Sequence, residues 1–312
     1  MRFMVAAVVF LFIDIAHASC GSAYCLVNTQ LGTQGAMAHE GSQLDLRYEY
    51  IHQDQLMSDD SKAKPEGVLD EHDEVSTVNR NWQLTYSYVD HDGWGISINA
   101  PIVSREHDHI HNDIGGPEAE EWRFTELGDV RVLGQFQLST HDNPANSYGV
   151  IGGVKLPTGK TNIDNRDGED AERTLQPGTG TTDIIVGAYY RQALDTRSGV
   201  FAQVLAQSAV NSDDHFKPGE SLVMDVGYHF AATERVGLNA QLNYLVKWRD
   251  AGAQAEPAES GLRALFFSPG INYALTPSTQ VYGFVQLPLY QNVNGTQLTA
   301  DSALTAGVSI RF

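Results

Sequence analysis

The sequence predicts an all-β fold, a transmembrane antiparallel β-barrel of about 12 strands with both termini on the periplasmic side. Three observations predict it. The N-terminus is typical of an exported protein, apolar and polar residues alternate from residue 42 to the end, and the connections are alternately short and long. The chain of 312 residues contains no linker of biased composition, so residues 42–312 are expected to form one barrel domain.

Residues 1–18 are expected to be a signal peptide that is removed on export. Arg2 precedes a short apolar run, and the small residues Ala16 and Ala18 mark the expected cleavage site. The run is shorter than the roughly 20 apolar residues that a helix needs to cross a bilayer. A lipoprotein acylated at Cys20 is an alternative, although His17 stands where such sites favour an aliphatic residue.

Residues 19–41 are expected to form a periplasmic segment before the barrel. They contain both cysteines of the chain, Cys20 and Cys25. Because the periplasm is oxidising, we expect a disulfide between them. Their spacing is neither CxxC nor CxxCH, which disfavours a redox pair or a covalent haem.

The strands are predicted from apolar residues with a period of two. In residues 44–50, leucine and tyrosine share one face while Asp45, Arg47 and Glu49 share the other. The same alternation recurs in residues 81–88, 94–100, 222–230, 236–244 and 304–312. Such strands have one apolar and one polar face. A β-sandwich has the same alternation, so the connections decide between the two folds.

The connections favour the barrel, because short inner turns alternate with long outer loops in transmembrane barrels. Short turns are expected near Asp90–Asp92, Thr140–Asn146, Asp195–Ser198, Thr233–Arg235 and Thr276–Ser278. Long loops are expected at 53–75, 104–123, 157–180, 211–219, 249–261 and 291–300. The last strand ends in Phe312, which resembles the C-terminal signal that the barrel-assembly machinery reads in outer-membrane proteins.

The formal net charge of −19 is concentrated in the expected outer loops. Segments 53–75, 104–126 and 157–183 carry −6, −5 and −3, which is fourteen of the nineteen excess negative charges. A solvated surface explains this most simply. Divalent cations that bridge to lipopolysaccharide phosphates, or an acidic vestibule that enriches cations, are alternatives. Nucleic acid is not expected as a partner for such a surface.

Two loop segments contain candidate metal ligands. His107, His109 and His111 alternate, so an extended backbone would place all three imidazoles on one face, as a Zn²⁺, Cu²⁺ or Ni²⁺ site requires. A flexible exposed loop rich in histidine is the simpler explanation. Residues 164–170 resemble a calcium loop, but the alignment places Ile163 at the first ligand position.

A hydrolase is a third possibility, with Ser139 and His141 as the nearest nucleophile and base. The two residues lie in an expected turn, where Asp142 and Asn143 favour a turn over a catalytic strand. No dinucleotide fingerprint or phosphate-binding glycine loop occurs in the sequence, and no cofactor is expected.

Three segments carry a family resemblance. They are GDVRV at 128–132, GVKLPTGK at 153–160 and LQPGTGTTD at 175–183. Together they resemble the signatures of an outer-membrane transporter family labelled for the meta-pathway of phenol degradation. The resemblance implies a barrel that transports small solutes, aromatic ones among them, and it implies no binding residues. Without the family resemblance, these residues have a structural interpretation. Pro157 and Gly159 are expected to end one strand, and Gly178 and Gly180 are expected to precede the next.

We therefore expect a protein of the cell outer membrane that is a channel or transporter for passive passage of small solutes, with aromatic and cationic solutes as candidates. The expected partners are membrane lipid, lipopolysaccharide, the barrel-assembly machinery, a small solute and divalent cations. If the apolar faces meet lipid, the interior is lined by Asp45, Arg47, Glu49, Asp129, Arg131, Asp183, Arg191, Asp225, His229, Lys247 and Arg311. A non-conducting structural or metal-binding barrel is the alternative if these charges pair and close the lumen.

Overall fold

The computed structural model describes residues 40–64, 72–113, 116–139 and 145–312. The predicted signal peptide and the predicted disulfide between Cys20 and Cys25 lie outside these residues. Within them the chain forms fourteen β-strands. They are β1 (Gly41–Ser58), β2 (Ser61–Lys62), β3 (His72–Val89), β4 (Trp94–Asp113), β5 (Gly116–Leu127), β6 (Arg131–Gln137), β7 (Asn146–Lys155), β8 (Asp183–Ala193), β9 (Ser198–Ala209), β10 (Ser221–Ala231), β11 (Val236–Lys247), β12 (Leu262–Ala274), β13 (Thr279–Val293) and β14 (Thr296–Arg311). None of the described residues forms a helix that is long and apolar enough to cross a membrane.

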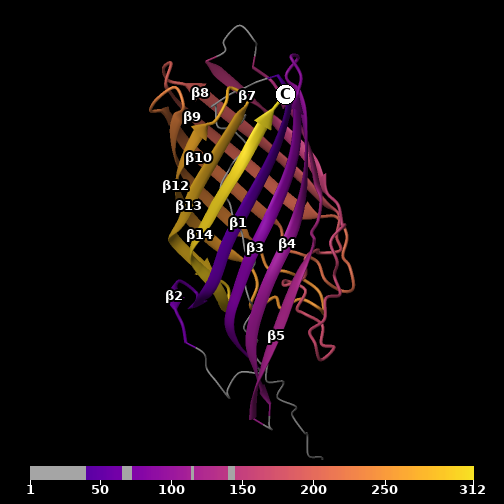
Figure 1. Cartoon of the computed structure of the whole chain (residues 1–312). Coiled ribbons are helices and arrows are strands. Elements are labelled where there is room, and N and C mark those ends of the chain that lie inside the picture. Colours follow the sequence, from indigo (N-terminus) through magenta and orange to yellow (C-terminus); the bar gives the residue numbers. More distant parts are fainter. Residues whose placement is uncertain (1–39, 65–71, 114–115, 140–144) are drawn as a thin grey trace, which may run out of the picture.

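The strands form one closed antiparallel barrel. Each barrel strand pairs with its neighbours in chain order, and β14 returns to pair with β1, from Gln43 opposite Arg311 to Ser58 opposite Thr296. Figure 1 shows β14, β1, β3 and β4 side by side along the wall. Twelve strands make the ring, since β2 is a two-residue extension and β5 and β6 occupy one position. The predicted fold class and strand number are confirmed.

The strand formed by β5 and β6 bends in the middle. β6 pairs with the first part of β4, from Trp94 to Asn99, whereas β5 pairs with its second part, from Ile102 to Asp113. Residues 128–130 join the two. At Gly128 a Cβ atom would lie 3.0 Å from the side chains of Pro101 and Val103, so a larger residue at this bend would require its neighbours to shift.

The two ends of the barrel differ. At one end, called the turn end, short turns join β3 to β4, β8 to β9, β10 to β11 and β12 to β13. The chain also ends there, because Arg311 donates its backbone N–H to Ser278 and Ser42 donates to Phe312. This is the upper end in Figure 1, where the C-terminus is marked. The opposite end, called the loop end, bears the long connections.

Four of the five predicted turns are confirmed, and the fifth includes residues 140–144, which are not described. Two predicted loops are wrong. Residues 104–123 form most of a long hairpin of β4 and β5, and residues 291–300 form the ends of β13 and β14 around a two-residue turn at Asn294 and Gly295. Much of segment 53–75 is also strand. These hairpins extend beyond the apolar belt, where water reaches their outer face, so the apolar alternation that predicts strands is absent there.

The barrel has an apolar exterior and a polar interior. Exposed apolar side chains include Leu46, Leu84, Ile98, Val150, Val186, Val226, Leu242, Ile271 and Leu304. Buried polar side chains include Asn79, Gln241, Asn243, Ser268, Gln286 and Ser309. Apolar area left in water costs roughly 25 cal/mol per Å². An exterior of this kind is therefore suited to lipid, and the pairing of β14 with β1 leaves neither of these two strands with an open edge in the membrane.

Candidate functional site

The residues predicted to line the interior lie on the strands, except Asp129 in the bend between β5 and β6, and they differ in burial. Asp45, Glu49, Asp129, Asp183, Asp225 and Lys247 are buried. Arg47 follows the same alternation on β1. Arg191 pairs with Ser147 and Phe201, and His229 pairs with Asn239, and these three partners are buried. Arg311 lies two residues from buried Ser309 on β14.

Several of these interior charges are held by neighbouring side chains. The Tyr282 hydroxyl donates to Asp45 at 2.9 Å, and Asn243 donates to Asp225 at 2.7 Å. Arg47 lies 2.8 Å from Glu49. Pairing of this kind compensates for the loss of water around a buried charge.

One charged residue of the inner face is accessible to solvent. Arg131 on β6 pairs with Asn99 on one side and with buried Lys155 on the other. Paired residues share a face of the sheet, so the Arg131 side chain points into the barrel. Yet Arg131 is exposed. The interior beside β6 therefore holds accessible space.

The connection between β7 and β8, residues 156–182, crosses the mouth of the barrel at the loop end and is called the mouth loop. Its buried residues Ala171 and Leu175 pack with Trp122 of β5 and Leu298 of β14, and Leu56 of β1 lies against the same cluster. β1 and β14 lie across the ring from β7 and β8. The loop therefore spans the opening and does not fold back over the outer wall.

Side chains around the rim hold the mouth loop in place. Arg105 of β4 donates to the carbonyl oxygens of Leu175 and Thr174, the latter at 3.2 Å, and Trp122 donates to the Glu169 carbonyl at 3.0 Å. Arg173 of the loop lies 2.8 Å from Asp213. Its guanidinium stacks 5.2 Å from the ring centre of Phe216, in the next long connection.

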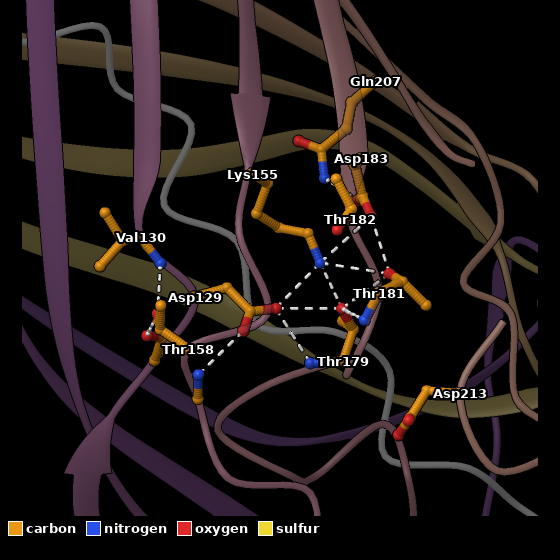
Figure 2. Close-up of polar contacts among 12 residues, drawn as sticks. Asp129, Val130, Lys155, Thr158, Thr179, Thr181, Thr182, Asp183, Gln207 and Asp213 are labelled. Atoms are coloured by element: carbon orange, nitrogen blue, oxygen red, sulfur yellow. Dashed lines mark hydrogen bonds and ion pairs between the residues drawn. The ribbon is translucent and has the colours of Figure 1, made fainter. Parts of the chain in front are cut away.

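The two ends of the mouth loop meet at a buried charge cluster, called the Lys155 cluster and composed of Asp129, Lys155, Thr179, Thr181 and Asp183. Figure 2 shows the Lys155 amine at its centre. That amine lies 2.9 Å from Asp129 and 3.2 Å from Asp183, and it also donates to the hydroxyls of Thr179 and Thr181. Gln207 of β9 donates to the second oxygen of Asp183 at 2.6 Å.

Asp129 ties both ends of the mouth loop to the wall. Its carboxylate accepts the backbone N–H of Gly159 at the start of the loop and that of Thr179 near its end, each at 3.0 Å. Between these ends the backbones of Gly159 and Gly178 touch, and a Cβ atom at either would lie 2.7 Å from the other's Cα. Glycine at both positions is therefore required by the close approach of the two chain segments.

The Lys155 cluster unites the three segments that carry the family resemblance. Asp129 comes from the first, Lys155 and Gly159 from the second, and Gly178, Thr179, Thr181 and Asp183 from the third. Sequence reasoning assigned the second and third segments to chain punctuation and missed Lys155. The signal was present, since a lysine in an otherwise apolar strand needs a buried partner, and Asp129 and Asp183 were already expected inside.

A small cavity lies inside the barrel near the loop end, on the side of β1 and β11–β14. It has a volume of about 50 Å³. Its walls are mostly apolar, and its polar lining includes Gln53, Gln286 and Gln291. Among the apolar lining residues are Ile51, Leu245, Ala264, Phe266, Val293 and Leu298. Leu298 also belongs to the cluster that holds the mouth loop, so the cavity adjoins that loop. Such a site suits a small apolar group and offers amides for hydrogen bonds.

The candidate metal ligands separate in the structure. His107 and His109 lie in β4, where they are buried and close to Glu74 of β3, whereas His111 is outside that group. Among the described residues, the segment 164–170 contributes to no group of potential metal ligands. Ser139 is described, but His141 lies outside the described residues.

Comparison with known proteins shows the fold. No protein-family model matches the chain, and no curated protein sequence matches it. The COG4313 outer membrane channel from Pseudomonas putida F1 is a similar solved structure, with 13% identity and a TM-score of 0.68 over 92% of this chain and 100% of that one. The P. putida toluene transporter TodX is 10% identical, with a TM-score of 0.50 over 96% of this chain and 99% of that one. The chain therefore has the fold of outer-membrane β-barrel channels.

Proposed function

We propose that this protein is an outer-membrane channel for the passive passage of small solutes, in which the mouth loop is the constriction. The observation that carries the proposal is the mouth loop itself, which is anchored across the opening by the buried Lys155 cluster. The apolar exterior suits the membrane, and the exposed Arg131 on the inner face indicates water inside. In this proposal the turn end faces the periplasm and the loop end faces outward.

The solutes we propose are small and largely apolar, aromatic ones included. The cavity beside Phe266 and Leu298 supports this, because its lining is mostly apolar. The family resemblance of the three segments agrees with it, as does the similarity in fold to the toluene transporter TodX. A cationic solute is supported by the acid-rich outer segments, but not by interior carboxylates, several of which are engaged by neighbouring side chains.

Conductance in planar bilayers tests the channel. We expect purified, folded protein to produce discrete but small openings, since the mouth loop leaves a narrow path. Liposome swelling should be faster with a monocyclic aromatic solute than with a disaccharide. A barrel that neither conducts ions nor admits any solute would refute the proposal and favour the structural or metal-binding alternative.

No catalytic step is part of the proposal. Passage along a lumen requires binding and diffusion and no covalent chemistry, and the residues assigned to it above are anchoring or lining residues.

A further inference from the structure

Three metal-ligating side chains converge in the wall of the barrel near the loop end, away from the Lys155 cluster. They are Glu74 of β3 and His107 and His109 of β4. The side chains of Glu74 and His107 are fully buried, and His109 is buried as well. One potential ligand atom of each residue lies within 4.8 Å of those of the other two. Two imidazoles and one carboxylate form a donor set that suits Zn²⁺ and its neighbours among the divalent transition metals.

A β-bulge brings Glu74 into this group. Thr77 pairs with His107, so regular pairing would place Val75 opposite His109. The register instead shifts between Glu74 and Ser76, and Glu74 pairs with His109 while Val75 is exposed. Bulges redirect side chains and are common beside functional sites. Here the bulge exchanges a valine for a carboxylate at the position facing the two histidines.

Each histidine is oriented through one ring nitrogen. Nδ1 of His107 lies 2.8 Å from the Thr77 hydroxyl, and Nε2 of His109 lies 2.7 Å from the Glu120 carboxylate of β5. A ligating histidine usually bonds to a carboxylate, carbonyl or water through its other nitrogen, which fixes the ring and its tautomer. The Trp122 ring packs against both imidazoles, with centroid distances of 5.8 Å to His107 and 4.7 Å to His109. The cluster is therefore rigid and shielded.

The charge of the cluster also fits a cation. A carboxylate in a fully buried position is costly unless positive charge compensates it, and a bound divalent cation would supply such charge. Nε2 of His107 lies 3.6 Å from a Glu74 oxygen. Small side-chain movements would bring both atoms to ligand distance from one bound ion.

We propose that Glu74, His107 and His109 bind one divalent transition-metal ion of the Zn²⁺ type, with Thr77 and Glu120 as positioning residues. His111 is not a ligand in this proposal, because the structure leaves it outside the cluster. The site joins β3 to β4 and is independent of solute passage, so it can exist whether or not the barrel conducts.

Metal binding to the full-length, folded protein tests the site. After stripping with a chelator, wild-type protein should take up one equivalent of Zn²⁺ by elemental analysis, and Co²⁺ should give the visible absorption of a low-coordinate site. Glu74→Gln and His109→Gln should abolish stoichiometric binding. Glu120→Gln and Thr77→Val should weaken it by about 10- to 100-fold, as losses of orienting groups do.

Matched controls distinguish this site from surface histidines. His111→Ala alters the next histidine along β4, and His91→Ala alters the group of Asp90, His91 and Asp92 at the turn end, in which His91 and Asp92 are exposed. Both variants should bind one equivalent as the wild type does. Heat-modifiable migration verifies that each variant is folded. Equal binding by wild type and Glu74→Gln, or loss of binding in His111→Ala, would overturn the proposed ligand set.

Discussion

At the scale of residues, Lys155 is the buried cation on which the anchoring of the mouth loop depends. It lies between two carboxylates, and the partners of those carboxylates reach both ends of the mouth loop. Sequence reasoning placed Asp129 and Asp183 inside and left open whether a positive charge neutralises the interior carboxylates. The structure assigns that role to Lys155, because side-chain reach and the bend at residues 128–130 decide the pairing, and neither can be read from alternation.

Replacing Lys155 should loosen the mouth loop. Lys155→Met leaves Asp129 and Asp183 buried beside each other, and removal of one partner of a buried ion pair typically costs about 3–5 kcal/mol. We expect a lower temperature for heat-modified migration and noisier, larger conductance.

Two further variants serve as controls for the effect of Lys155→Met. Adding Asp129→Asn and Asp183→Asn should recover part of the lost stability, since no carboxylate is then left without its cation. Lys160→Met removes an exposed partner of Glu126, a pair worth about 0–1 kcal/mol, and should change little. Equal behaviour of the Lys155 and Lys160 variants would contradict the anchoring role.

The contact of Gly159 with Gly178 should tolerate no side chain. Gly178→Ala places a Cβ 2.7 Å from the Cα of Gly159, so the loop ends must separate. We expect raised conductance and faster proteolysis within the mouth loop. Gly152→Ala is the matched control, because nothing lies within 4 Å of a Cβ there. If both variants behave as wild type, the contact does not hold the loop.

At the scale of elements, the sequence predicted strands well where they cross the apolar belt and poorly beyond it. Leu84, Ile98 and Leu242 face outward as the alternation requires. The hairpin of β4 and β5 was taken for a loop, because charged residues and histidines occupy both of its faces. The mouth loop was located correctly as a connection, but its path across the lumen depends on Leu175 reaching Leu298, a contact between segments far apart in sequence.

Different parts of the mouth loop should affect conductance differently. The tip at residues 164–170 is largely exposed, and a backbone bridge joins Asp164 to Asp170. Replacing residues 165–168 of the tip with glycine keeps the Glu169 carbonyl that Trp122 contacts and should leave conductance nearly unchanged. Replacing Ala171 and Leu175 with serine should detach the buried part and enlarge the openings in planar bilayers. A larger effect from the tip than from the buried pair would show that the constriction lies elsewhere.

At the scale of the whole molecule, orientation in the membrane is a prediction that surface labelling can test. In a background with Cys20 and Cys25 replaced by serine, Arg166→Cys in the mouth loop should react with an impermeant thiol reagent on intact cells. Glu234→Cys, in a tight turn at the turn end, should react only after the cells are lysed. The reverse pattern would invert the orientation.

Phe312 should contribute to barrel assembly through its aromatic ring and, separately, through its backbone hydrogen bonds. Phe312 is 73% exposed, and its backbone exchanges hydrogen bonds with Ser42 where the ring closes. Deleting Phe312 should lower the yield of heat-modifiable barrel. Phe312→Ala keeps the backbone bonds and loses the aromatic ring, whereas Phe312→Tyr keeps both. A normal yield from the deletion would show that neither the ring nor the bonds guide insertion.

The pairing of β1 with β14 also constrains when the protein can fold. Residues 43–58 pair with residues 296–311, so the hydrogen bonds that close the ring cannot form until residues 296–311 have been synthesised. Contacts of such high sequence separation form slowly, and an open sheet meanwhile presents two long edges to other chains. We therefore predict that an unfolded-chain-binding chaperone added during refolding raises the yield of closed barrel, and that aggregation increases when the chaperone is left out.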